Sequence, residues 1–290
     1  MTGSPMSWSP MTWRMSIEHV TSYEYEGDVL ASYNEARISP ARDANQMVLN
    51  HRVEVSPVVS VMRYTDCWGT AVSAFDVHEP HRRLVVTGSS LVETVAPSPD
   101  TTDIEWEVLR DEKVRDRFYE FISPSSHVPL DLPFREVGAG LAQSRSPHET
   151  VEAVGAWVRE NLVYEPGATD VSTSARSALE LGRGVCQDFV HVTLALLRSV
   201  GIPARYASGY LHPDADAAID DAVTGQSHAW LEAWTGSWQR IDPTNGAEVG
   251  ERHVFVARGR DYGDVTPLKG VYNGPAEHAA EARVIIRRVA

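Results

Sequence analysis

The chain has 290 residues, of which 42% are hydrophobic and 23% charged, and its formal net charge at pH 7 is −14. This length allows two modest domains with sizeable cores, and the composition is that of a soluble globular protein. The acidic balance argues against nucleic acid as a partner, since phosphate binding needs clustered Lys and Arg. No stretch approaches the roughly 20 apolar residues of a membrane span, so we expect no membrane association.

The chain contains two cysteines, Cys67 and Cys186, which lie far apart and form no Cys-x-x-Cys pair. A disulfide framework and a structural zinc site are therefore not expected, and the sequence predicts neither a metal nor a cofactor. Residues 1–12, rich in Ser, Pro and Met, lack the apolar run of a signal peptide and are expected to form a flexible tail. A reducing cytoplasm is the simplest compartment for such a chain.

Residues 13–97 carry the signals of strands and turns. Alternating runs such as Leu49–Val55 are broken by Glu-Gly-Asp, Ser-Pro and Trp-Gly, at the spacing of a sandwich or barrel. We therefore predict an N-terminal β-sandwich-like domain. Cys67 falls in one of the turns with no histidine pattern tied to it, and we interpret it as an inert thiol.

Residues 98–144 are predicted to be a connecting region with one helix. Apolar side chains recur at helical spacing from Val114 to Ile122, and the pattern stops before Pro124. The stretch 127–132 indicates loops.

Residues 145–250 are predicted to form the second domain, and residues 251–290 a C-terminal extension. The first helix of the second domain begins with a capping box formed by Ser146 and Glu149, and Pro147 occupies its first position. A further helix of this domain is predicted over 173–181, and strands are predicted over 204–211, 228–234 and 238–242. A strand over 282–287 is predicted in the C-terminal extension.

A polar loop, residues 212–227, separates the first two of these strands. It carries Asp214, Asp216, Asp220 and Asp221 but lacks the glycine and terminal glutamate spacing of a calcium loop. We interpret it as a solvated flap.

Cys186 lies between a glycine-rich turn and a segment that is apolar on almost all sides, which predicts a buried central helix that begins at the cysteine. Unpaired backbone N–H groups at a helix start favour negative charge, and the thiolate is the reactive form of cysteine. A cysteine nucleophile also needs a base and a group that orients the base. His228 opens one predicted strand and Asp242 closes the next.

The hairpin between these two strands can be checked by counting. If residues 235–237 form a three-residue loop, Trp230 faces Asp242, and His228 is the diagonal neighbour of Asp242 on the same face, at roughly 7–8 Å between backbones. A His and an Asp side chain can meet across that gap. A two-residue loop would instead place them on opposite faces, so the inference depends on the turn.

The same register makes Glu232 and Arg240 a cross-strand ion pair, which we interpret as structural. Each triad candidate also has a structural explanation: Cys186 as a small core residue, His228 as a packed strand residue, and the sequence after Asp242 as an ordinary turn. The order of the three along the chain, with a glycine turn before the cysteine and a hairpin joining the other two, favours chemistry.

These residues also carry a family resemblance. Five separated motifs, over roughly residues 145–246, resemble the core of the transglutaminase-like superfamily, a papain-related group of cysteine enzymes. They are Gly184-Val-Cys-Gln-Asp-Phe, Gly201-Ile-Pro-Ala-Arg-Tyr, Gly209-Tyr, His228-Ala-Trp-Leu-Glu and Trp238-Gln-Arg-Ile-Asp-Pro-Thr. The β-rich first third resembles the bacterial transglutaminase-like N-terminal domain, and the segment from Gly259 to Gly270 resembles the region that follows the core in those proteins.

The resemblance implies an α+β fold: a papain-like core, in which a central helix bearing the cysteine packs on an antiparallel sheet, preceded by the β-sandwich-like domain. It also implies a triad with Cys186 as nucleophile, His228 as base and then acid, and Asp242 as orienter. The family's chemistry is acyl transfer from a peptide or protein amide through a thioester.

Other residues are expected around this triad. The backbone N–H of Cys186 is expected to meet the oxyanion. Candidates for a second oxyanion contact or for lining the cleft are Gln187, Tyr206 and Tyr210. Candidates for supporting roles around the triad are Asp188, Trp230, Glu232 and Arg240.

We therefore expect cysteine-dependent hydrolysis or acyl transfer at an amide. Protease-like hydrolysis is favoured over crosslinking, because nothing in the sequence indicates a site that excludes water until an amine arrives. One alternative is a binding or scaffold protein that keeps the fold without turnover, against which the intact triad counts. Another is a small-molecule acyltransferase that uses a donor such as acyl-CoA, for which no basic patch lies near the motifs.

Overall fold

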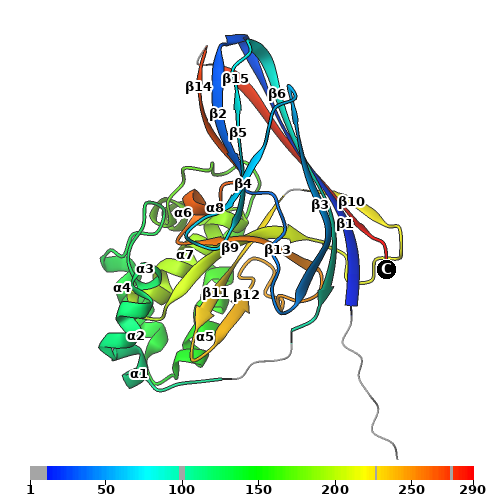
Figure 1. The fold of residues 1–290 in the computed structure, drawn as a ribbon. Helices are drawn as coiled ribbons and strands as arrows, with labels where there is room; N and C mark the ends of the chain where they lie inside the picture. Colours follow the sequence, from blue (N-terminus) through cyan, green and yellow to red (C-terminus); the bar gives the residue numbers. More distant parts are fainter. Residues whose placement is uncertain (1–11, 98–101, 226, 275–276) are drawn as a thin grey trace, which may run out of the picture.

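The computed structural model describes residues 12–97, 102–225, 227–274 and 277–290. The expected flexible tail, residues 1–12, lies outside the described residues except for Thr12, which begins the first strand. The chain forms a two-sheet β part that rises from a mixed helix and sheet part (Figure 1). The predicted α+β fold class is confirmed.

The β part consists of two antiparallel sheets. The five-stranded sheet has the order β10-β15-β1-β6-β3, and the four-stranded sheet has the order β14-β2-β5-β4. The strands are β1 Thr12–Val29, β2 Ala31–Ala36, β3 Gln46–Ser56, β4 Met62–Thr65, β5 Ala71–Val77, β6 His81–Val95, β10 Ala222–Gly225, β14 Leu268–Asn273 and β15 His278–Arg288.

β1 shows why this region forms strands. Its first half alternates exposed and buried residues, so one face is apolar, with Trp13, Met15 and Ile17 all buried. These side chains belong to the same hydrophobic cluster as the core of the second part, together with Val284 and Ile286 of β15. The first half of β1 therefore packs into the core of the second part, while Phe75, Val77 and Leu84 belong to a separate cluster within the β part.

Three strands of the β part come from outside residues 13–97. β14 and β15 belong to the C-terminal extension: β14 pairs with β2, and β15 pairs with β1, where Ile286 lies opposite Ile17. β10 belongs to the loop that we interpreted as a solvated flap, and that interpretation is wrong for 222–225, which pair with β15. The backbone N–H of Asp220 also bonds Arg288 O. The alternation of apolar and polar residues predicts that a segment is a strand but not which distant strand it pairs with. β10 is also too short to show this alternation clearly.

The connecting region contains four helices, so the prediction of one helix is wrong. They are α1 Trp106–Arg110, α2 Glu112–Arg117, α3 Tyr119–Ile122 and α4 Leu132–Ala142. The Asp111 side chain accepts the N–H groups of Lys113 and Val114 and so begins α2 directly after α1 ends. α4, for which we made no prediction beyond the loops expected at 127–132, buries Phe134 and packs against α7 (Cys186–Ser199).

The second part has a four-stranded antiparallel sheet of order β12-β11-β9-β13 and a short parallel pair, β7 and β8. Its helix α7 packs against β9, β11, α4, α5 and α6 and is almost entirely buried, as predicted. The remaining elements are α5 Pro147–Asn161, β7 Val163–Tyr164, α6 Ala175–Leu181, β8 Arg183–Gly184, α7 Cys186–Ser199, β9 Ala204–Leu211, β11 His228–Trp234, β12 Trp238–Ile241, β13 His253–Gly259 and α8 Tyr262–Val265.

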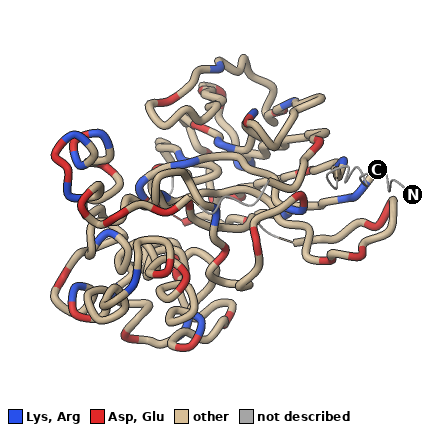
Figure 2. The backbone as a smooth tube through the Cα atoms, turned by 90° about the horizontal axis from the view of Figure 1, so that it is seen from below, with Lys and Arg blue, Asp and Glu red and all other residues tan. Residues whose placement is uncertain are grey.

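The predicted capping box of α5 is present. Ser146 Oγ accepts the N–H of Glu149 at 3.2 Å, and Glu149 Oε2 accepts the N–H of Ser146 at 2.9 Å. Basic residues lie scattered among acidic ones over the described elements (Figure 2). Among the described residues, no helix is long and apolar enough to cross a bilayer.

The predicted ion pair of Glu232 and Arg240 belongs to a larger buried network. Arg240 Nε lies 3.5 Å from Glu232 Oε1, while Arg258 and Arg205 donate to Oε2 at 2.6 and 2.7 Å. Asp43 of the β part also pairs with Arg240. Burial alone would raise the pKa of Glu232, but Arg258 and the other arginines lower it to about 2. The network therefore persists at neutral pH and is lost only as pH falls through that value.

Replacing Glu232 by Gln is expected to destabilise the protein by about 3 kcal/mol at pH 7, because three guanidinium groups lose their shared carboxylate. We take the lower end of the range for buried pairs because these arginines keep some contact with water. Urea unfolding measures the change. Glu93→Gln, which breaks an exposed pair with Arg14, is the control and should cost less than about 1 kcal/mol. Equal losses in the two variants would contradict the prediction.

Candidate active site

Cys186 is the first residue of α7, and the chain before it is shaped by two glycines. Gly182 adopts the left-handed conformation (φ 65°) that ends α6. A Cβ at Gly184 would lie 2.5 Å from the Asp188 carboxylate, so only glycine leaves room for that side chain. Asp188 accepts the N–H of Val185 at 2.8 Å and thereby holds the turn that presents Cys186.

The β11–β12 hairpin has the register that the counting argument predicts. Glu232 lies opposite Arg240, and Trp234 lies opposite Trp238. His228, only 12% exposed, donates from Nε2 to Asp242 Oδ2 at 2.8 Å. The Cys186 thiol lies near enough to this imidazole to raise its pKa.

Asp242 is fully buried and held by several donors. Its Oδ1 accepts the backbone N–H groups of Thr244 and Asn245 at 3.0 and 3.1 Å, and its Oδ2 accepts Asn245 Nδ2 at 2.8 Å. Burial alone would raise the pKa of Asp242, but these donors, His228 first, hold it well below its ordinary value. The carboxylate is therefore ionised beside His228.

The charges of the three groups reinforce one another. Burial alone would lower the pKa of His228, but its hydrogen bonds to Asp242 and Cys186 raise it to about 9. Burial raises the pKa values of Tyr206 and Tyr164, and the proximity of Cys186 raises both further. His228 is therefore protonated at neutral pH, beside the ionised carboxylate of Asp242.

Comparison with known sequences assigns both parts of the chain. The model of the bacterial transglutaminase-like N-terminal region matches residues 15–93, and the model of the transglutaminase-like superfamily matches residues 135–243, which contain Cys186, His228 and Asp242. The chain belongs to the transglutaminase-like superfamily.

Relatives of this transglutaminase-like protein extend over its whole length. An uncharacterized protein of Mycobacterium leprae is 46% identical over 278 residues, which are 96% of this chain and 100% of that protein. An uncharacterized protein of Mycobacterium tuberculosis is 30% identical over 289 residues, 92% of this chain and 90% of that protein. The crystal structure of a candidate cysteine protease from Cytophaga hutchinsonii has a TM-score of 0.77 at 20% identity and covers 97% of this chain and 92% of that one, so the fold is shared.

The cleft and oxyanion candidates do not lie as expected in the transglutaminase-like protein. Tyr210 does not line a cleft, because its hydroxyl bonds His19 Nδ1 at 2.9 Å and Ile38 O at 3.3 Å, inside the contact with the β part. Gln187 donates to Val171 O at 3.4 Å, so its amide is engaged by the loop before α6. Tyr206 is buried beside Cys186. The sequence pattern did not distinguish a buried tyrosine from one that lines a cleft.

The supporting candidates divide into two groups. Trp230 packs against the His228 ring, with centroids 6.2 Å apart, and Asp188 shapes the turn before the cysteine. Glu232 and Arg240 belong instead to the ion network that joins the sheet to the β part.

Sequence reasoning missed three residues of the site. Asn245 bonds Asp242 and follows it in the Asp-Pro-Thr-Asn turn. Such turns favour hydrogen bonds from the following residues to the aspartate side chain, so the sequence could have predicted this contact. Tyr164 pairs with Gly184 across the short β7–β8 sheet and is exposed near Cys186. His253 is the first residue of β13, a separate strand, and no nearby sequence motif predicts that it lies at the site.

Within the described residues, His228, Asp242 and His253 place ligand-type atoms within 4.8 Å of one another. The hydrogen bonds show how these atoms are used. Gly250 N–H donates to His253 Nδ1 at 3.2 Å, so the His253 proton is on Nε2, and His228 Nε2 donates to Asp242. Both nitrogens that face the carboxylate are therefore donors. The three residues are better described as a carboxylate between two N–H groups than as a metal site.

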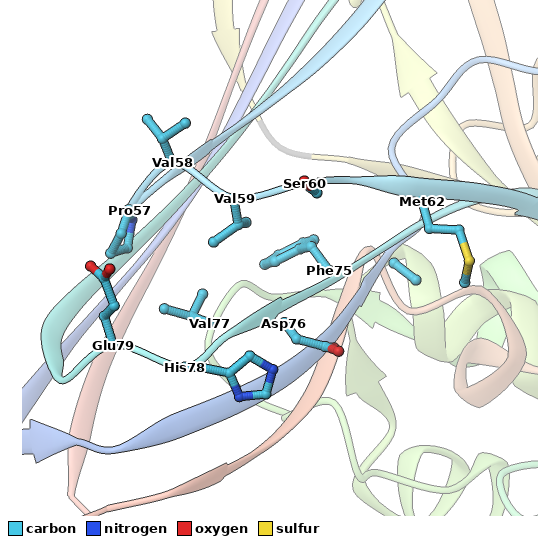
Figure 3. Close-up of a pocket in the computed structure, with 11 residues that line it drawn as sticks. Pro57, Val58, Val59, Ser60, Met62, Phe75, Asp76, Val77, His78 and Glu79 are labelled. Atoms are coloured by element: carbon cyan, nitrogen blue, oxygen red, sulfur yellow. The ribbon is translucent and has the colours of Figure 1, made fainter.

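Two cavities occur among the described residues, and Cys186 lines neither. One, about 490 Å³, lies in the β part between the segment Pro57–Ser60 and β5, with Phe75 and Val77 at its floor (Figure 3). The other, about 760 Å³, lies between α5 and β12 and is bounded by the loop that carries Asp242. The thiol is instead half-buried at the molecular surface.

Proposed function

We propose that this protein is a cysteine-dependent amide hydrolase that acts through a thioester on Cys186. The observation that supports this best is the placement of His228, which bonds Asp242 at 2.8 Å and lies near enough to Cys186 for that group to raise its pKa. The buried carboxylate stabilises the imidazolium, and the imidazolium stabilises the thiolate.

The steps follow from this charge arrangement. The Cys186 thiolate attacks the amide carbonyl, and the oxyanion is met by the Cys186 N–H, for which the described part of the chain offers no acceptor. The His228 imidazolium gives its proton to the amine as the C–N bond breaks, leaving a thioester. Neutral His228 then takes a proton from water, which attacks the thioester and releases the acid and the thiolate.

Hydrolysis is favoured over crosslinking because Cys186 keeps partial contact with solvent. Cys186 is half-buried and lies in neither cavity, and its neighbour Tyr164 is 54% exposed. Water can therefore reach a thioester at this position without waiting for an amine. Peptide or protein amides are the proposed substrates, because an open surface site accepts a carbonyl that is part of a longer chain.

The test is a panel of peptides that carry backbone amides and glutamine side-chain amides, incubated with and without a primary amine at pH 7. Acid-quenched samples are searched by mass spectrometry for an acyl group on Cys186 and for product. We expect an adduct and a hydrolysed product that both vanish in Cys186→Ala. If most of the product carries the added amine, the reaction is transfer to an amine and not hydrolysis. The absence of any Cys186-dependent adduct or product would favour the scaffold alternative.

A further inference from the structure

His253, a residue outside the triad, lies against the carboxylate that orients the triad. It is the first residue of β13, and its side chain is 3% exposed. Its Nε2 lies 3.5 Å from Asp242 Oδ2, the same oxygen that accepts the proton of His228. Asp242 Oδ2 therefore lies between two imidazole rings.

The tautomer of His253 is set by its other nitrogen. Gly250 N–H donates to Nδ1 at 3.2 Å, which makes Nδ1 the acceptor and leaves the ring proton on Nε2. Among the described residues, Nε2 is a buried side-chain atom with no partner within ordinary hydrogen-bond geometry. The nearest group of opposite polarity is the Asp242 carboxylate.

Packing fixes the direction of this N–H. The His253 ring meets Trp230 edge to face, with centroids 5.3 Å apart, and lies 6.1 Å from the ring of His228. Trp230 is itself fully buried and packs on His228. The ring of His253 is therefore held on one side by Gly250 and on another by Trp230, with Nε2 aimed at Asp242.

We propose that His253 is a positioning residue: its neutral imidazole, through Nε2–H, holds Asp242 Oδ2 in the orientation in which that oxygen receives the proton of His228. The inference rests on the proposed function. The separation of 3.5 Å is longer than an ordinary N–H···O bond, so the effect is an electrostatic alignment that strengthens when charge develops on the triad.

Two amide replacements separate this role from mere packing. In His253→Gln, the side-chain nitrogen reaches the position of Nε2 and can still donate to Asp242. In His253→Asn, the shorter side chain can still accept Gly250 N–H but does not reach the carboxylate. The readout is the rate of iodoacetamide alkylation of Cys186 at pH 6, which does not require a known substrate and so stays informative if turnover is never found.

We expect His253→Asn to lower the alkylation rate by about 10-fold, the size typical of one hydrogen bond to a charged group, and His253→Gln to stay within about 2-fold of the wild type. In an Asp242→Asn background the two variants should be indistinguishable, because the group that His253 aligns is gone. Equal rates for Asn and Gln in the wild-type background, or the same 10-fold loss in the Asp242→Asn background, would overturn the proposal. Thermal unfolding of each variant shows whether a loss of rate is a loss of fold.

Discussion

Replacing His228 by Ala is expected to lower the rate of alkylation of Cys186 at pH 6 by about 10²-fold. Only about 0.3% of an ordinary thiol is ionised at that pH, because its pKa is near 8.5. In the wild type, we expect the neighbouring imidazolium to stabilise the thiolate, and the pKa of His228, about 9, keeps the imidazolium charged at pH 6. Mass-spectrometric quantification of alkylated peptides over time measures the rate.

Cys67 supplies the control within the same molecule. It is exposed, whereas Cys186 is half-buried, so accessibility alone would make Cys67 react faster. We expect the reverse order below pH 7 in the wild type and no change at Cys67 in His228→Ala. If both thiols react slowly at pH 6 and rise together near pH 8.5, the activated thiolate is ruled out.

The change Asp242→Asn is expected to reduce turnover by about 10⁴-fold, the size seen when a triad carboxylate is replaced by an amide elsewhere. The neutral amide cannot stabilise the imidazolium, so only Cys186 still opposes the effect of burial, and the pKa of His228 falls from about 9. The protonated form is the one that stabilises the thiolate and protonates the leaving amine, so activity is lost as pH rises through this pKa. The basic limb of kcat/KM should therefore move from near pH 9 to lower pH.

Asp43→Asn is the matched control for this change. Asp43 is also mostly buried and paired with arginine, but it belongs to the network around Glu232 and not to the triad. It should weaken stability and leave the basic limb near pH 9. A basic limb that stays near pH 9 in Asp242→Asn would show that the carboxylate does not set the pKa of His228.

Local features of this protein could be predicted because neighbours in the sequence decide them. The capping box at Ser146 needs only residues three positions apart, and the hairpin register needs only the length of the turn at 235–237. The contact between His228 and Asp242 follows from that register. The turn that presents Cys186 at the start of α7 is likewise a matter of a few adjacent residues.

Short elements in less regular sequence could not be predicted in the same way. Helices α1 to α4 lie in a region where the pattern showed one helix, because caps such as Asp111 interrupt the periodicity, and α4 is supported by packing on α7. Tyr206 and Tyr210 of β9 have the even spacing of strand residues that share a face. The β part that covers Tyr210, however, lies far away in sequence. Burial of these groups is a property of the assembled fold.

The sequence by itself determined the helix start at Cys186, the hairpin that joins His228 to Asp242, and the family to which these motifs belong. The tertiary structure alone decided that α7 and β11 pack so that the thiol meets the imidazole, that β14, β15 and β10 complete the N-terminal sheets, and that His253 arrives beside Asp242 from a separate strand. The physical reason is the range of the interactions. Turns and caps are set by bonded neighbours, whereas pairing and burial depend on which distant surfaces exclude water together.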